Sequence, residues 1–86
     1  MKSMKIQLKL YASLGQYLPP GAEKNEILVD TKETTTVTDL LCEYDVPSEM
    51  CHLVLVNGKF VPPSERDKFK FSDGDALAVW PPVAGG

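Results

Sequence analysis

A single segment of the 86-residue chain has the periodicity of an amphipathic helix, and this limits the folds that the chain can adopt. Apolar residues recur at helical spacing from Val37 to Tyr44, which predicts one buried stripe. Thr36 and Asp39 form a variant of the capping box at its start, and Pro47 bounds its end. Because one helix can cover only one face of a sheet, the other face must meet water or a partner.

Strand patterns occur on both sides of this helix. Residues 5–11 alternate polar side chains with Ile6, Leu8 and Leu10, which is the period-two pattern of a half-buried strand. Residues 53–56 are all apolar, which predicts a central strand buried on both faces. The predicted strands, with a hairpin turn at Asn57-Gly58, are residues 5–11, 26–30, 53–56, 59–61 and 76–80.

The remaining segments have weaker patterns. Residues 1–3 are expected to form a loose N-terminus, and residues 12–21 to form at most one helical turn before a loop. Residues 66–71 alternate bases with other side chains, which predicts solvent-exposed charges around aromatic residues that anchor the segment to the core. The bases are Arg66, Lys68 and Lys70, the aromatic residues are Phe69 and Phe71, and a turn is predicted next at Asp73-Gly74-Asp75.

Size, charge and apolar content exclude several classes of protein. A chain of 86 residues forms one domain that buries about 60% of its unfolded surface, which leaves little room for an enclosed active site. The net charge of −3 and the acidic middle of the chain disfavour binding to nucleic acid. No apolar run approaches the roughly 18 residues of a membrane span, and the N-terminus lacks a signal-peptide core, so we expect a cytoplasmic protein without a membrane anchor.

The cysteines and the single histidine are the candidate metal ligands. Cys42 and Cys51 lie nine residues apart and His52 follows directly, so the set lacks the short, fixed spacings of zinc motifs. In a reducing compartment free thiols are most often buried as small hydrophobic groups. The sequence therefore predicts structural thiols and no metal site.

The last six residues differ in character from the rest of the chain. Pro81 and Pro82 fix φ and favour an extended path, whereas Gly85 and Gly86 have no Cβ and can follow almost any path. Six extended residues span about 20 Å, far enough for a terminal carboxylate to enter the cleft of another protein. We therefore expect residues 1–80 to form the folded domain and residues 81–86 to form a flexible tail. The alternative is that these last residues are a frayed terminus without a function.

These features together resemble a known family. The order of strands and helix is similar to the ubiquitin-like β-grasp fold, an α+β architecture with a mixed sheet of about four to five strands and one main helix on one face. The tail resembles that of the sulfur carriers, which include the small subunit of molybdopterin synthase and the thiamine-pathway carriers. The segments that carry the resemblance are Lys5-Ile6-Gln7-Leu8, Thr36-Val37-Thr38-Asp39-Leu40-Leu41, Val56-Asn57-Gly58-Lys59-Phe60-Val61, Asp73-Gly74-Asp75 and Pro81-Pro82-Val83-Ala84-Gly85-Gly86. Trp80 precedes the last segment, at a position where phenylalanine is more familiar in this family.

The resemblance implies a function for the tail. In such carriers the C-terminal carboxylate, here that of Gly86, is adenylated and converted to a thiocarboxylate that donates sulfur. The implied activating partner is an adenylating enzyme of the ubiquitin-activating type, which uses ATP and magnesium. The chain itself has no phosphate-binding loop and no convincing nucleophile and base pair, so we expect neither activity nor a bound cofactor for the chain alone. The residues that would present Gly86 are Pro81, Pro82, Val83, Ala84 and Gly85.

In the molybdopterin branch the implied partner is the large subunit of molybdopterin synthase, whose active site receives Gly86 and converts cyclic pyranopterin monophosphate into molybdopterin. We expect the chain to be monomeric when it is free. Its candidate docking residues are Tyr11, Phe60, Trp80 and Val83. Alternatively, bulky side chains cover the second sheet face internally. The alternative functions are a carrier for thiamine or another sulfur pathway, a ubiquitin-like modifier that forms isopeptide bonds with lysines, and a plain binding module with an inert tail.

Overall fold

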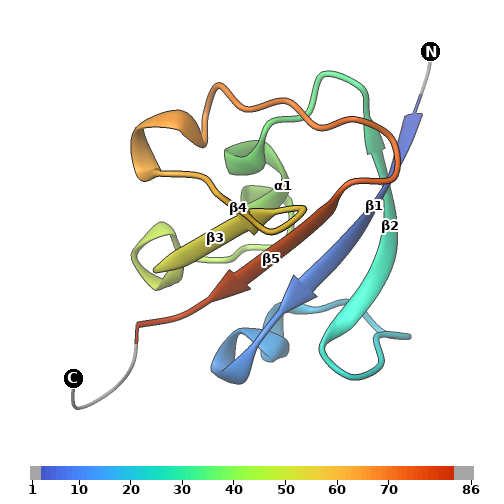
Figure 1. Ribbon diagram of the computed structural model, residues 1–86. Helices are drawn as coiled ribbons and strands as arrows, with labels where there is room; N and C mark the ends of the chain where they lie inside the picture. The colour runs from blue at the N-terminus through green and yellow to red at the C-terminus, as the bar shows by residue number, and fades with distance from the viewer. Residues whose placement is uncertain (1–2, 83–86) are drawn as a thin grey trace.

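Five strands form one mixed sheet (Figure 1). The structure is a computed structural model that describes residues 3–82. The strands are β1 (Ser3–Leu10), β2 (Glu26–Lys32), β3 (Leu53–Val56), β4 (Lys59–Phe60) and β5 (Ala76–Trp80). Their order across the sheet is β2-β1-β5-β3-β4, with β1 and β5 parallel and every other neighbouring pair antiparallel. The predicted α+β class and mixed sheet are confirmed.

One α-helix, α1 (Val37–Glu43), lies against one face of this sheet (Figure 1). The predicted capping box closes its first turn: the Asp39 amide donates to Thr36 Oγ1 at 3.1 Å, and the Thr36 amide donates to Asp39 Oδ2 at 3.1 Å. Val37 and Leu40 are fully buried, whereas Tyr44, expected in the same stripe, is the C-cap residue and only partly buried. The helix therefore starts where its cap signals predicted.

Three 3-10 helices complete the secondary structure of the described residues: η1 (Ala12–Tyr17), η2 (Ser48–Met50) and η3 (Pro63–Glu65). The prediction of at most one helical turn in residues 12–21 was wrong, because the six residues of η1 make about two 3-10 turns. Leu14 holds η1 in place, since its side chain is fully buried in the core. The described residues contain no helix with the length and apolarity that a membrane crossing requires.

The hydrophobic core lies between α1 and the sheet face that it covers. Ile6, Leu8 and Leu10 alternate along β1 and are fully buried, as their period-two pattern predicted. Phe71 is buried and Phe69 is partly buried, with 6.0 Å between their ring centroids, so the predicted aromatic anchors are confirmed. The largest fully buried side chains are Ile6, Leu8, Leu10, Leu14, Val37, Leu40, Val54, Leu77 and Val79.

The central strand of the sheet is β5, not β3 as predicted for residues 53–56. β3 lies between β5 and the two-residue strand β4. Val54 and Val56 are buried, whereas Leu53 is 36% exposed and Leu55 is partly exposed, so burial on both faces was also wrong. The burial prediction failed because the run is apolar on both sides, whereas the single helix covers one side only.

A tight hairpin joins β3 and β4 at Asn57-Gly58, as predicted. The two residues have φ of 52° and 83°, which is the left-handed pair of a type I′ turn. The Asn57 side chain also ties this hairpin to the start of β5. Its Oδ1 accepts from the Ala76 amide at 2.9 Å, and its Nδ2 donates to Asp75 Oδ1 at 2.8 Å.

The first strand starts earlier than expected. Ser3, predicted to lie in a loose N-terminus, is the first residue of β1 and pairs with Lys32. Met4 beside it is buried in the core, which holds this end of the strand against β2. Met1 and Lys2 lie outside the described residues.

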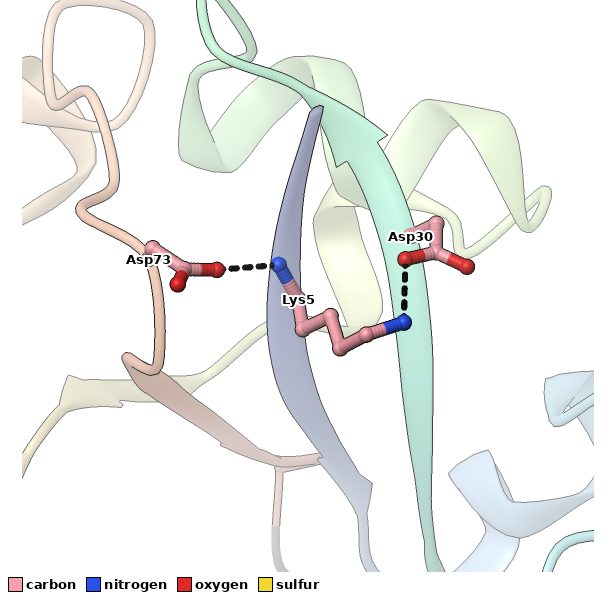
Figure 2. Close-up of polar contacts among 3 residues, drawn as sticks. All are labelled: Lys5, Asp30 and Asp73. Atoms are coloured by element: carbon pink, nitrogen blue, oxygen red, sulfur yellow. Dashed lines mark hydrogen bonds and ion pairs between the residues drawn. The ribbon is translucent and has the colours of Figure 1, made fainter. Parts of the chain in front are cut away.

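Lys5 joins β1 to the segments on both sides of it (Figure 2). Its amide nitrogen donates to Asp73 Oδ1 at 2.7 Å, and its Nζ lies 2.9 Å from Asp30 Oδ1 on β2. The hydrogen bond to Asp30 and the charge of that carboxylate raise the pKa of Lys5 above its ordinary value. The Gly74 amide donates to the Lys5 carbonyl at 2.8 Å, so the predicted turn at residues 73–75 is hydrogen-bonded to β1.

Arg66 is buried, contrary to the prediction that its charge is solvent-exposed. Its Nε donates to the Val61 carbonyl at 3.1 Å, and its Nη1 donates to the Cys51 carbonyl at 2.8 Å. These carbonyls lie just outside β4 and β3, where buried backbone acceptors need a donor from elsewhere, and Arg66 supplies it. Lys68 and Lys70 are exposed, as predicted.

Candidate functional site

The sheet face that α1 leaves uncovered carries a cluster of apolar side chains. Residues paired across neighbouring strands point to the same face of a sheet. Trp80 pairs with Leu53. Leu55 pairs with Ala78 on one side and with Phe60 on the other. We refer to Leu53, Leu55, Phe60, Ala78 and Trp80 as the apolar patch; Phe60 is 55% exposed, and each of the others is exposed at least in part.

Tyr11 lies beside the apolar patch, directly after β1. Its amide donates to the Val79 carbonyl at 3.1 Å, which continues the contact between β1 and β5. Its ring stacks on the Trp80 ring, with centroids 4.5 Å apart and an interplanar angle of 14°. The stack therefore fixes the Trp80 side chain at the point where the chain leaves the sheet.

The tail begins directly after β5. The Trp80 carbonyl accepts a hydrogen bond from the His52 amide at 3.0 Å. Pro81, which is partly buried, and Pro82, which is exposed, have no amide hydrogen to donate, so neither can extend the ladder of the sheet. The other predicted tail residues, Val83, Ala84, Gly85 and Gly86, lie outside the described residues.

The β1 and β2 half of the uncovered face is polar. Gln7 Nε2 donates to Glu26 Oε1 at 2.9 Å, and Lys5 forms its ion pair with Asp30. Leu28, which pairs with Gln7, is an exposed apolar residue in this half and is 54% exposed. The uncovered face is thus divided into a polar half and an apolar half, and the apolar half ends at the tail.

The two cysteines have different environments. Cys42 is exposed, so the prediction of a buried thiol was wrong there, because the residue lies just beyond the buried stripe of α1. Cys51 is buried, its Sγ donates to the Pro47 carbonyl at 3.4 Å, and burial raises the pKa of its thiol. Within residues 3–82, no group of three or more His, Cys, Asp or Glu side chains is placed to hold a metal ion.

The sequence identified part of this face. Tyr11, Phe60 and Trp80 were named as candidate docking residues, and the structure brings them to the uncovered side, with Tyr11 in contact with Trp80. Leu53 and Leu55 were not named, because their apolar run was interpreted as a strand buried on both faces. Both residues belong to the four-residue apolar run at residues 53–56.

The mixed sheet with one helix on one face, and a central strand that continues into a proline-glycine tail, define a ubiquitin-like protein with the β-grasp fold. A family model described as Mut7-C ubiquitin matches residues 3–85, and the chain belongs to this family. Among curated proteins, none matches the sequence.

Three solved structures show how far this likeness extends. The HVO 2177 protein of Haloferax volcanii is 26% identical, with 98% of this chain and 88% of that chain covered and a TM-score of 0.75. SAMP1 of Haloferax volcanii is 26% identical, with 95% and 99% covered and a TM-score of 0.65. A putative molybdopterin converting factor subunit 1 from Pyrococcus furiosus is 23% identical, with 93% and 99% covered and a TM-score of 0.64. The predicted β-grasp fold is confirmed.

Proposed function

We propose that the chain is a sulfur carrier whose C-terminal Gly86 carboxylate becomes a thiocarboxylate, and that it serves as the small subunit of molybdopterin synthase. The observation that carries this proposal is the direct continuation of the central strand β5 from the apolar patch into Pro81 and Pro82. A partner bound to the patch would have Gly86 within reach, because six extended residues span about 20 Å. The choice of pathway rests on the tail sequence, and the likeness to the Pyrococcus furiosus protein agrees with it at the level of fold.

The tail supplies the reacting group, and the partners supply its activation. A Gly86 carboxylate oxygen attacks the α-phosphorus of ATP, which the activating enzyme binds with magnesium, and pyrophosphate leaves. A sulfide-equivalent donor then attacks the acyl carbon of this adenylate, AMP leaves, and a thiocarboxylate remains. Glycine suits both steps, since a residue without Cβ can thread a narrow channel to another protein's active site.

The apolar patch is the proposed contact with the large subunit. Phe60 is a largely exposed aromatic side chain, the kind of residue that anchors protein interfaces when a partner buries it. The Tyr11–Trp80 stack adds a rigid, partly exposed aromatic surface next to the tail. Burial of this aromatic surface by a partner would orient the tail toward that partner, because Trp80 directly precedes Pro81, the first residue of the tail.

A second candidate function is that of a protein modifier joined through Gly86 to lysines of other proteins. The 26% identity to SAMP1, a small archaeal modifier protein, favours this candidate. Both functions begin with the same acyl adenylate. They differ in the nucleophile that displaces AMP, which is a sulfur donor for the carrier and a lysine amine for the modifier.

Intact-mass spectrometry tests the shared first step. The starting mass verifies that Gly86 is the terminal residue. After incubation with the activating enzyme, magnesium, ATP and sulfide, we expect the exchange of one oxygen for one sulfur at Gly86, and no exchange when ATP is omitted. An unchanged mass, with an enzyme that is active on another carrier, would contradict both candidate functions.

The pathway is tested with the thiocarboxylated chain. Addition of the large subunit of molybdopterin synthase should convert cyclic pyranopterin monophosphate into molybdopterin, whereas the sulfur-accepting enzyme of the thiamine pathway should gain no activity. The opposite result assigns the chain to the thiamine pathway. Detection of Gly86 on lysines of cellular proteins, without turnover by either enzyme, would instead favour the modifier.

A further inference from the structure

Arg66 is a buried cation with one side-chain nitrogen that has no hydrogen-bond partner among the described residues. The residue is only 9% exposed, and its Nε and Nη1 donate to the carbonyls of Val61 and Cys51. Nη2 is buried and has no hydrogen-bond partner among the described residues. Two carbonyls therefore hold the guanidinium in place, and Nη2 could donate to a further acceptor if one reached it.

No described side chain forms an ion pair with Arg66. Across residues 3–82, the ion pair found joins Lys5 to Asp30, so Arg66 has no carboxylate partner there. The Cys51 thiol nearby donates from its Sγ to the Pro47 carbonyl, and burial raises the pKa of this thiol. Since a buried charge is costly unless it is paired, this position favours an anion that residues 3–82 do not supply.

Arg66 borders a hollow of about 390 Å³ at the C-terminal end of α1. The hollow opens on the surface that carries the exposed Cys42, and part of its lining is apolar. Its other lining residues include Thr38, Leu41, Asp45, Val46 and Pro47. Apolar side chains and Arg66 thus border the same hollow.

We propose that this hollow binds a short-chain monocarboxylate. The carboxylate accepts a hydrogen bond from Arg66 Nη2, and the alkyl chain packs against Leu41 and Val46. The lining contains one guanidinium, that of Arg66, and one carboxylate, that of Asp45. The Asp45 carboxylate and the C-terminal end of α1 both add negative charge at the hollow, which lowers the affinity for any anion and disfavours a phosphate or another dianion more than a monocarboxylate.

The covered position of Nη2 limits the affinity. Because Nη2 is buried in the free chain, the groups that cover it must shift before a carboxylate can reach it. This cost and the single charge-assisted contact lead us to expect a dissociation constant on the order of millimolar. Exchange should then be fast, which suits measurement by NMR chemical shifts.

Titration of the full chain with butyrate, followed by ¹H–¹⁵N NMR, tests the site. We expect saturable shifts of the Thr38, Cys42 and Arg66 amides and of the Arg66 side-chain Nε–H. Butyramide is the matched neutral probe, since it has the same alkyl chain without the charge, and it should bind at least about tenfold more weakly. Sodium chloride at equal ionic strength controls for a non-specific salt effect.

Two variants of neighbouring residues on α1 locate the binding. Cys42→Phe adds a bulky ring at the hollow without altering Arg66 and should weaken butyrate binding by about tenfold or more. Glu43→Phe adds the same ring at an exposed position outside the lining of this hollow and should leave the affinity unchanged. Both variants retain Arg66 and its contacts. A loss of binding therefore cannot result from the removal of this buried side chain.

Several results would overturn the proposal. These are the absence of saturable shifts with butyrate in the wild-type chain, equal affinity for butyrate and butyramide, and unchanged binding to folded Cys42→Phe. Equal loss of binding in Glu43→Phe would also contradict the assigned location. A crystal structure grown with butyrate in which water alone contacts Nη2 would show that the donor serves a solvent molecule instead.

Discussion

The ring of Tyr11 stacks on the ring of Trp80, with 4.5 Å between the centroids and 14° between the planes. Because one ring follows β1 and the other ends β5, this contact joins two strands at the base of the tail. We expect Tyr11→Ala and Trp80→Ala to be non-additive, with a coupling energy of about 0.5–1.5 kcal/mol in a double-mutant cycle measured by urea unfolding. Trp80→Phe should keep most of the coupling, whereas a coupling near zero in the cycle would show that the stack does not stabilise the fold.

Phe60→Asp should weaken association with the large subunit by about tenfold or more, because it introduces a charge into the proposed contact. Leu28→Asp is a closely matched control, since Leu28 is 54% exposed against 55% for Phe60 and lies on the same sheet face in its polar half. Leu28→Asp should leave the affinity unchanged, and thermal unfolding should show that both variants fold. Calorimetric titration measures the difference, and equal affinities for the two variants would remove Phe60 from the interface.

Gly86→Ala should block thiocarboxylate formation and leave the free energy of unfolding unchanged. The expected loss is steric, because an added Cβ obstructs a channel shaped for glycine. Intact-mass spectrometry after the ATP and sulfide incubation measures the first effect, and urea unfolding measures the second. Ala84→Gly is the control, since it changes the tail by one methyl group at a position away from the reacting carboxylate. Wild-type yields of the thiocarboxylate from Gly86→Ala would refute the steric argument.

Alkylation should separate the two thiols. At about pH 8 we expect iodoacetamide to modify exposed Cys42 at least about tenfold faster than Cys51, which is buried and has a raised pKa. Peptide mass mapping measures both rates, and comparable rates would contradict the buried environment of Cys51.

The raised pKa of Cys51 also predicts a pH dependence of stability. When the pKa of a group is higher in the folded state than in the unfolded state, the group stabilises the fold at pH values below its unfolded-state pKa. This stabilisation is lost as the pH rises through the folded-state pKa. The free energy of unfolding should therefore fall more steeply from about pH 8 to about pH 10 in the wild-type chain than in Cys51→Ala. Cys42→Ala is the control and should keep the wild-type slope. Equal slopes for wild type and Cys51→Ala would contradict the shift.

Local signals located the helix and the hairpin. The box of Thr36 and Asp39 is contained in four consecutive residues, and its hydrogen bonds need nothing from the rest of the chain. Asn57-Gly58 likewise specifies its own turn, because both residues tolerate positive φ. Such features are predictable because the residues that make the contacts are neighbours in the sequence.

Features that depend on distant segments were predicted poorly. The buried Arg66 side chain donates a hydrogen bond to the Cys51 carbonyl, which lies 15 residues away in the sequence. No local sequence pattern predicts that contact. Exposure of Leu53 and Leu55 depends on where the one helix packs. The aromatic residues of the candidate site could be named from the sequence, but the contact of Tyr11 with Trp80 requires the parallel pairing of β1 with β5.

That parallel pairing has a practical consequence for handling the protein. Ser3 begins β1 and Trp80 ends the neighbouring parallel strand, so these residues lie at opposite ends of the sheet (Figure 1). An eight-residue strand is about 26 Å long. An affinity tag, a fluorophore or a surface linker placed ahead of Ser3 would therefore stand well away from Pro82, whereas the same label fused after Gly86 would block the carboxylate that we propose to react.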